Sequence, residues 1–144
     1  MVKSHGAWQC WACPPVLLID ITGAINKEGA IQQVDEIMTL LSAAPLQYRV
    51  LLALIERWDY STHDAPPEFQ LFHRWLTSET AIRDCVYVTA GVGLKKAFIE
   101  LGWESPSPVA RHYFSDVAGA MAFLECQQIP CPEPLHARSA LIPS

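Results

Sequence analysis

Hydrophobic and polar positions along the chain predict strands that alternate with helices. Residues 16–22 are apolar at nearly every position, as in a strand covered on both faces, and 49–56, 85–90 and 110–114 predict further strands. Amphipathic stretches follow them. In residues 28–41, one side carries Ala30, Ile31, Val34, Ile37, Met38 and Leu41, and the other side carries Gln32, Gln33, Asp35 and Glu36.

The connections between these segments predict how the strands run. Residues 7–12 predict a short first strand, which Pro14 and Pro15 end because neither can donate a ladder hydrogen bond. Its short turn predicts an antiparallel pair, whereas the longer crossovers predict parallel strands. We therefore expect a single small α/β domain with a mixed, mostly parallel sheet of four to five strands, an antiparallel N-terminal edge strand and about four helices.

Two later connections carry distinctive turn chemistry. After the strand at 49–56, residues 58–64 predict a loop in which Asp64 or Ser61 caps the next helix and Pro66-Pro67 opens it. After the strand at 85–90, Gly91 and Gly93 flank the start of a predicted helix that bears Leu94, Phe98 and Leu101. Asp116 is expected to cap the last helix of the domain.

The chain divides near residue 126. Residues 5–126 hold the predicted strands and helices. Residues 127–144 form a proline-rich tail without periodicity, for which we expect extended or disordered chain.

Composition narrows the class of protein. With 144 residues, 51% of them hydrophobic and 17% charged, the chain is long enough for one folded domain. A net charge of −5 disfavours a nucleic-acid partner. No apolar run is long enough for a signal peptide or a transmembrane segment, which predicts a cytoplasmic protein.

Three local patterns together resemble the SpoIIAA-like branch of the STAS superfamily, also described as STAS/SEC14 domain proteins. The first is His5-Gly6 before an edge strand, followed by the strand at 16–21 and the turn at 23–29. The second is the third strand ending in a loop before Pro67-Glu68 at a helix start, and the third is residues 111–116 before an alanine-rich helix. The resemblance covers residues 5–126 and implies a sheet flanked by helices, and a regulatory or ligand-binding module rather than an enzyme. The phosphorylation motif of anti-sigma factor antagonists has no equivalent at 59–62, so a serine-phosphorylation switch is not implied.

The cysteines allow two further interpretations. Cys10 and Cys13 have the spacing of a redox pair, but they precede a strand instead of opening a helix, so the thiol lacks activation. With Cys126 and Cys131 they could form a zinc site. Because the chain has five cysteines and no export signal, free thiols are the favoured interpretation.

Two other groups have weak catalytic or binding patterns. Ser61, His63 and Asp64 are the residue types of a hydrolytic triad, but sequence neighbours rarely converge as a triad does, so loop polarity and helix capping explain them better. Gly91 and Gly93, with Lys95 nearby, could hold an anion at a helix N-terminus; a simple chain turn is the favoured alternative.

These observations favour a non-enzymatic regulatory or protein-interaction module without a cofactor. Loops at 23–28, 57–65 and 90–94 are expected at one end of the sheet, since the carboxyl ends of parallel strands form a crevice. The expected binding residues are Trp58, Tyr60, Ser61, Thr62, His63, Asp64, Gly91 and Gly93, and a homodimer through the edge strand is possible. The alternative is a carrier of a small apolar ligand or lipid, with a cavity lined by Phe69, Phe72, Trp75, Phe98 and Phe123.

Overall fold

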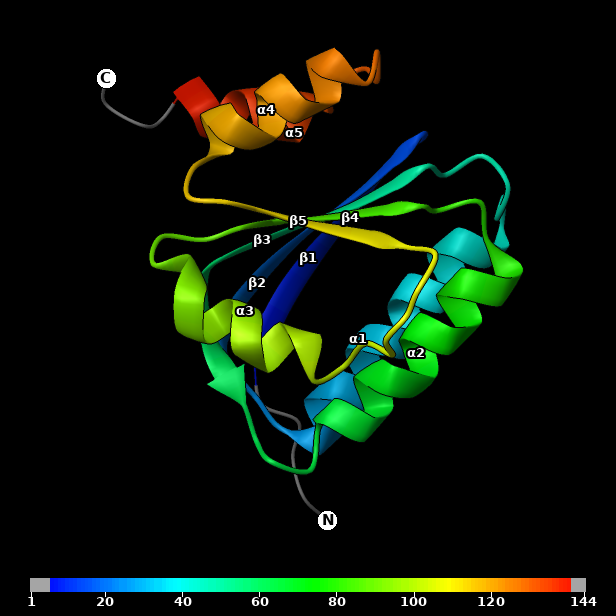
Figure 1. Cartoon of the computed structure of the whole chain (residues 1–144), viewed down its shortest axis with the longest axis vertical. Helices are drawn as coiled ribbons and strands as arrows, with labels where there is room; N and C mark the ends of the chain where they lie inside the picture. The colour runs from blue at the N-terminus through cyan, green and yellow to red at the C-terminus, as the bar shows by residue number, and fades with distance from the viewer. Residues whose placement is uncertain (1–5, 141–144) are drawn as a thin grey trace.

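Five strands form one sheet in the computed structural model, which describes residues 6–140 (Figure 1). In spatial order the strands are β1 (Ala7–Cys13), β2 (Val16–Ile25), β3 (Val50–Ser61), β4 (Asp84–Val88) and β5 (Ala110–Phe114). β1 and β2 are antiparallel, and every other neighbouring pair is parallel. The predicted fold class, with its antiparallel edge strand, is confirmed.

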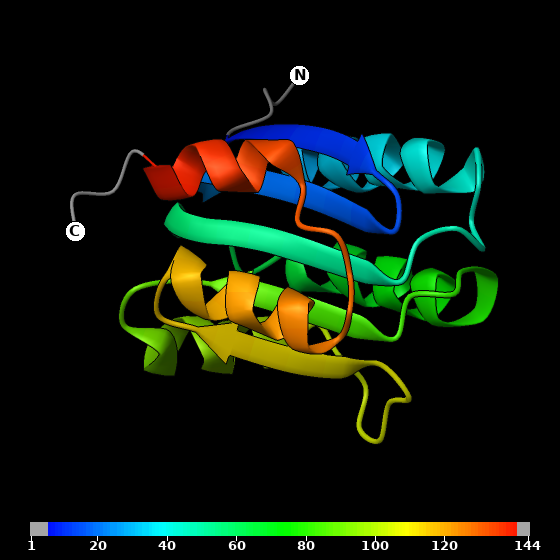
Figure 2. The same cartoon turned by 90° about the horizontal axis from the view of Figure 1, so that it is seen from above.

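Helices cover both faces of this sheet. The helices are α1 (Lys27–Ser42), α2 (Pro66–Glu79), α3 (Val92–Glu100), α4 (Val117–Cys126) and α5 (Glu133–Ala140). Figures 1 and 2 show α1, α2 and α3 on one face and α4 with α5 on the other. Within residues 6–140, no helix combines the length and the apolarity that a membrane crossing requires.

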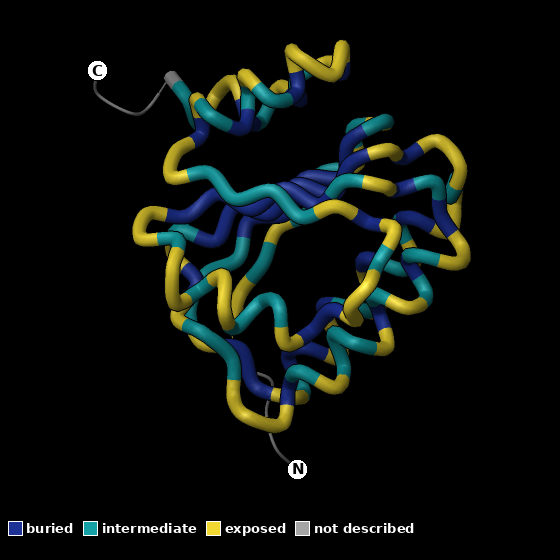
Figure 3. The backbone as a smooth tube through the Cα atoms, viewed as in Figure 1, coloured by how far each residue is buried: buried dark blue, intermediate teal, exposed yellow. Residues whose placement is uncertain are grey.

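The core consists of two layers separated by the sheet. Because successive strand residues point to opposite faces, Leu51 and Ala53 of β3 belong to the cluster under α1–α3, and Leu52 and Leu54 belong to the cluster under α4 and α5. The middle strands are buried along most of their length (Figure 3).

Side chains cap two of the helices, and one of the two predicted caps is confirmed. The Asn26 side chain accepts from the Gly29 amide at 2.9 Å, and Asp116 accepts from the Gly119 amide at 2.8 Å, as expected for Asp116. The predicted cap of α2 by Asp64 or Ser61 is wrong. Ala65 occupies the N-cap position without a side-chain bond, and the two prolines alone open the helix.

The expectation of extended or disordered chain after residue 126 is wrong for the described part of the tail. Helix α5 lies there, and its Leu135 is fully buried in the cluster under α4 and α5. Pro132 and Pro134 mislead because they precede or open the helix, where a missing amide proton costs nothing. A helix of 8 residues is also too short to show a clear period.

The end of β3 differs from the sequence prediction in a way that affects the site. Strand β3 continues to Ser61, pairing Gly23 with Trp58 and Ile25 with Ser61, so the expected loop at 58–64 is mostly strand. On α3, Leu94 is 72% exposed, and Leu101 at the C-cap of this helix is 58% exposed.

Candidate functional site

A cavity of about 100 Å³ lies between the sheet and helices α1, α2 and α3. Strands β2, β3 and β4 form its floor, and the helices contribute mainly apolar side chains to its walls: Val34, Ile37, Phe69, Phe72, Phe98 and Ile99. An apolar recess with a small number of polar groups is the usual form of a small-molecule site.

Local sequence explains how this space arises. Along β3 the short side chain of Ala53 lies between Leu51 and Ile55 on the same face, and all three line the cavity. On α2, Phe69 and Phe72 are three residues apart and so share a helix face that turns toward the sheet.

Two residues that line this cavity each carry a buried side-chain oxygen without a protein partner in the described range. Gln33 is only 2% exposed, and its Oε1 has no hydrogen bond to any residue in the described range. The buried Oγ of Ser61 is in the same situation. An unpaired buried polar group costs about 1–3 kcal/mol, so native structures rarely keep one without a reason. The expectation that Gln33 lies on the solvent side of its helix is therefore wrong.

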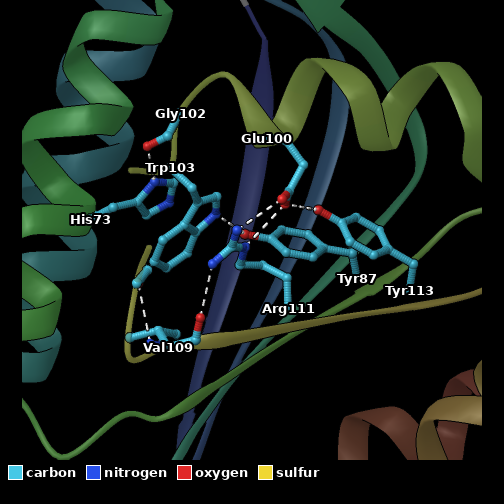
Figure 4. Close-up of polar contacts among 9 residues, drawn as sticks. His73, Tyr87, Glu100, Gly102, Trp103, Val109, Arg111 and Tyr113 are labelled. Carbon is cyan, nitrogen blue, oxygen red and sulfur yellow. Dashed lines mark hydrogen bonds and ion pairs between the residues drawn. The ribbon is translucent and has the colours of Figure 1, made fainter. Parts of the chain in front are cut away.

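His73 forms part of another wall of the cavity and is neutral. Its Nδ1–H donates to the carbonyl oxygen of Gly102 at 2.6 Å, and its ring stacks on Trp103 at 3.7 Å between centroids (Figure 4). Burial lowers the pKa of His73 from 6.5 to about 4. With Nδ1 protonated, Nε2 is left as a hydrogen-bond acceptor.

A polar network next to His73 joins α3 to β5. Arg111 donates to Glu100 from Nε at 3.0 Å and from Nη2 at 2.8 Å, and the Tyr113 hydroxyl donates to Glu100 at 2.6 Å (Figure 4). The Arg111 bond holds the pKa of Glu100 below its usual range. Trp103 Nε1–H donates to the Tyr87 hydroxyl at 3.1 Å. The bidentate pair fixes α3 over the sheet and so keeps the cavity in shape.

An aromatic cluster closes the cavity toward the end of β3. Trp58, Tyr60 and Phe98 lie with ring centroids 5.1–5.9 Å apart. Trp58 is only 6% exposed, so its expected place on an exposed contact surface is wrong. The Lys95 ammonium donates to the Ile55 carbonyl at 2.8 Å. It is thus directed at β3 and not toward the start of its own helix, where the sequence suggested an anion site.

The segment after β3 is exposed at Thr62, His63 and Asp64. Thr62 Oγ1 donates to Asp64 Oδ1 at 2.5 Å, and this bond lowers the pKa of Asp64. Ser61 Oγ has no partner in the described range, so the three types of a hydrolytic triad do not converge.

Gly91 and Gly93 are exposed at the start of α3. Gly91 is the N-cap with φ +67°, a conformation that glycine adopts without strain, and a Cβ at either glycine would meet nothing within 4 Å. The loop at 57–65 contacts the loop at 23–28 through the Thr62 amide and the Ile25 carbonyl at 2.9 Å.

The structure separates the cysteines of the proposed redox or zinc site. Cys10 pairs with Ile19 and Cys13 with Val16, residues that belong to cores on opposite faces of the sheet, so the two thiols point apart. Burial raises the pKa of Cys10 to about 12, which disfavours the reactive thiolate. No group of three or more metal-ligating side chains occurs within residues 6–140.

The aromatic residues expected around a ligand cavity are divided by the sheet. Phe69, Phe72 and Phe98 line the cavity, whereas Trp75 packs nearby without lining it and Phe123 lies on α4 at the opposite face. Gln33 and His73 were missed as lining residues. Helical spacing carries the signal for both, since Gln33 is three residues from Ala30 and four from Ile37, and His73 is four from Phe69.

Comparison with known families and with curated proteins gives no match. Solved structures of similar shape exist. An uncharacterized DUF3478-family protein with a SpoIIAA-like fold from Shewanella loihica PV-4 has a TM-score of 0.60 and 16% identity, over 86% of this chain and 97% of that one. The anti-sigma factor antagonist SpoIIAA in its unphosphorylated form has a TM-score of 0.59 and 14% identity, over 85% of this chain and 100% of that one. An anti-sigma factor antagonist from Mycobacterium paratuberculosis has a TM-score of 0.57 and 12% identity, over 84% of this chain and 95% of that one. The SpoIIAA-like fold expected from the sequence is thereby confirmed.

Proposed function

We propose that this protein is a non-enzymatic regulatory module that binds a protein partner. Two of the proteins that share its fold are anti-sigma factor antagonists, which supports a role in protein interaction. Fold likeness alone does not carry function, so the argument depends on the surface.

The observation that carries the proposal is an exposed apolar stripe along α3 and its C-cap residue, Leu101. Leu94 and Leu101 are 72% and 58% exposed, and Ala97 is exposed between them at helical spacing. Exposed apolar residues that share one helix face are typical of a binding surface. The bidentate pair of Arg111 and Glu100 holds this helix rigidly, which lowers the entropic cost of binding.

The polar part of the proposed surface comes from the expected binding residues. Thr62, His63 and Asp64 are exposed after β3, and Gly91 and Gly93 are exposed at the start of α3. Trp58, Tyr60 and Ser61 support this surface from behind: Trp58 and Tyr60 contact Phe98 of α3, and Ser61 pairs with Ile25.

The test compares two leucines of similar exposure. In Leu94→Asp a charge enters the proposed surface, whereas Leu46→Asp changes a residue that is 78% exposed in the connection between α1 and β3. A photo-crosslinking residue at His63 identifies the partner in the native host, and its affinity is then measured with both variants. We expect Leu94→Asp to weaken binding about tenfold or more and Leu46→Asp to leave it unchanged. Equal affinities, or no crosslinked partner at His63, would contradict the proposal.

The cavity favours a second candidate, a carrier or sensor of a small apolar ligand. Its volume of about 100 Å³ is near that of an engineered cavity of about 150 Å³ that binds benzene, and far below what a full lipid chain needs. Native mass spectrometry of the protein from its own host tests this candidate. A retained small molecule supports it, and a bare mass together with no detectable binding of small aromatic probes would reject it.

A further inference from the structure

The cavity under α1–α3 is apolar along most of its wall, but Gln33 and Ser61 also line it, and each has a buried side-chain oxygen without a partner in the described range. We propose that the cavity binds a small, uncharged, mainly apolar molecule that carries a hydroxyl group, and that Gln33 and Ser61 bind this hydroxyl. The inference rests on the ligand-binding function proposed above and specifies its ligand.

Gln33 is the strongest part of the argument. Its side chain lies on the buried stripe of α1 with Ala30 and Ile37 and is only 2% exposed. Despite this burial, its Oε1 has no hydrogen-bond partner in the described range. An apolar residue at this position would pack against the same neighbours without a desolvation cost. The amide is therefore explained by a ligand that hydrogen-bonds to it.

The walls of the cavity indicate that the ligand is uncharged. Among residues 6–140, no aspartate, glutamate, lysine or arginine side chain lines it, and the lining residue His73 is neutral because burial lowers its pKa to about 4. A charged ligand would lose its hydration without gaining an opposite charge.

The polar atoms indicate which neutral group the ligand carries. Gln33 Oε1 can only accept a hydrogen bond, whereas the Ser61 hydroxyl can donate or accept one. A ligand hydroxyl is the smallest neutral group that donates to the first and accepts from the second. A ketone or an ether lacks the donor, and an aliphatic amine is charged at neutral pH.

Size limits the ligand further. A volume of about 100 Å³ holds a single aromatic ring or a chain of a few carbons. Phenol is thus a suitable probe, and fluorobenzene is its matched control, because fluorine replaces the hydroxyl at nearly the same volume and cannot donate a hydrogen bond.

The experiment titrates the whole chain with phenol and with fluorobenzene and follows backbone amide shifts by NMR. We expect shifts at cavity residues and an affinity for phenol about five to ten times higher, the gain of one net hydrogen bond. Gln33→Met keeps the length of the side chain without its amide and should bring the two affinities together, as should Ser61→Ala to a smaller degree. Gln32→Met changes the exposed neighbour on α1 and should preserve the preference.

The outcomes separate the two proposals. Equal affinities for the probes in the unmodified protein would overturn the hydroxyl inference and leave the ligand-binding function standing, with water as the partner of Gln33 and Ser61. Binding of neither probe would overturn both. Ala53→Ile, which fills the cavity from β3, should abolish binding of both probes while circular dichroism shows an intact fold. Unchanged binding in this variant would place the ligand elsewhere and reject the inference.

Discussion

The two faces of the sheet are buried by similar aliphatic side chains but differ in how completely they are filled. Under α4 and α5, Leu52 and Leu124 are fully buried, and the buried carboxylate of Asp20 accepts bonds from Arg57 and Arg138 at 2.7 and 2.5 Å. Under α1–α3, a cavity remains, with the polar side chains of Gln33 and Ser61 facing it. The comparison indicates that the first face stabilises the fold and that the second carries binding.

The largest expected difference between the two faces is in the loss of stability when either of two adjacent leucines of β3 is truncated. Leu52 is fully buried under α4 and α5, whereas Leu51 lines the cavity. We expect Leu52→Ala to lower the free energy of unfolding by about 3–5 kcal/mol and Leu51→Ala by about 2 kcal/mol, because fewer packing contacts are lost beside an existing cavity. Urea unfolding measures both, and equal losses would contradict the proposed difference between the faces.

A second expected difference depends on pH. The pKa of His73 is about 4 in the folded protein and ordinarily 6.5. As the pH falls, His73 therefore takes up a proton in the unfolded state at a higher pH than in the folded state. The stability that His73 contributes is therefore present above about pH 6.5 and is lost as the pH falls toward 4. The full effect corresponds to roughly 3 kcal/mol, and partial exposure of the side chain reduces it to about 2 kcal/mol.

Comparing variants isolates this contribution. His73→Phe should flatten the dependence of the free energy of unfolding between pH 7 and about 4. His136→Phe, at an exposed position of α5, should leave the dependence unchanged. A curve for His73→Phe parallel to that of the unmodified protein would show that His73 is not the group responsible.

The ion pairs of Asp20 predict a smaller effect on the other face. The Arg138 side chain is 23% exposed and ties α5 to β2, whereas that of Arg57 is 57% exposed. We expect Arg138→Ala to lower the free energy of unfolding by about 1–2 kcal/mol and Arg57→Ala to lower it by about 0.5 kcal/mol. The first loss stays moderate because Arg57 still pairs with the carboxylate. Amide hydrogen exchange in α5 should rise in the first variant alone. Unaltered exchange there would show that Arg138 does not anchor the helix.

The smallest effect comes from adding two methyl groups on each face. The valine side chain of Ala53→Val extends into the cavity, and we expect it to raise the free energy of unfolding by about 0.5 kcal/mol. Ala120→Val enters the filled cluster under α4 and should lose about 1 kcal/mol through overpacking and a poorer helix former. Thermal unfolding measures both, and a stabilised Ala120→Val would mean that this face also has free space.

Regular patterns in the sequence predicted most of the fold. The strand at 110–114 and the Asp116 cap agree residue by residue, because an extended segment followed by an Asx cap is a local signal. Helix α5 was missed because its contacts are distant: Leu135 packs under the sheet and Arg138 bonds to Asp20, 118 positions earlier. Local patterns contain no information about such contacts.

The candidate site was predicted only in part. Phe69, Phe72 and Phe98 line the cavity as the carrier hypothesis expected, since apolar residues at helical spacing face a core. Gln33 was placed on the polar side because a glutamine normally is exposed. Only packing of α1 against the sheet reveals that its amide is buried.

By itself, the sequence determined the order of the strands and of the helices through α4, the antiparallel edge pair and the resemblance to SpoIIAA-like proteins, because these depend on periodicity, turn residues and local caps. The tertiary structure alone decided that Cys10 and Cys13 point to opposite faces, that Trp58 is buried and that Gln33 faces a cavity. Each of these depends on which segments lie opposite one another across the sheet. That arrangement results from packing of the whole chain, and no stretch of sequence contains it alone.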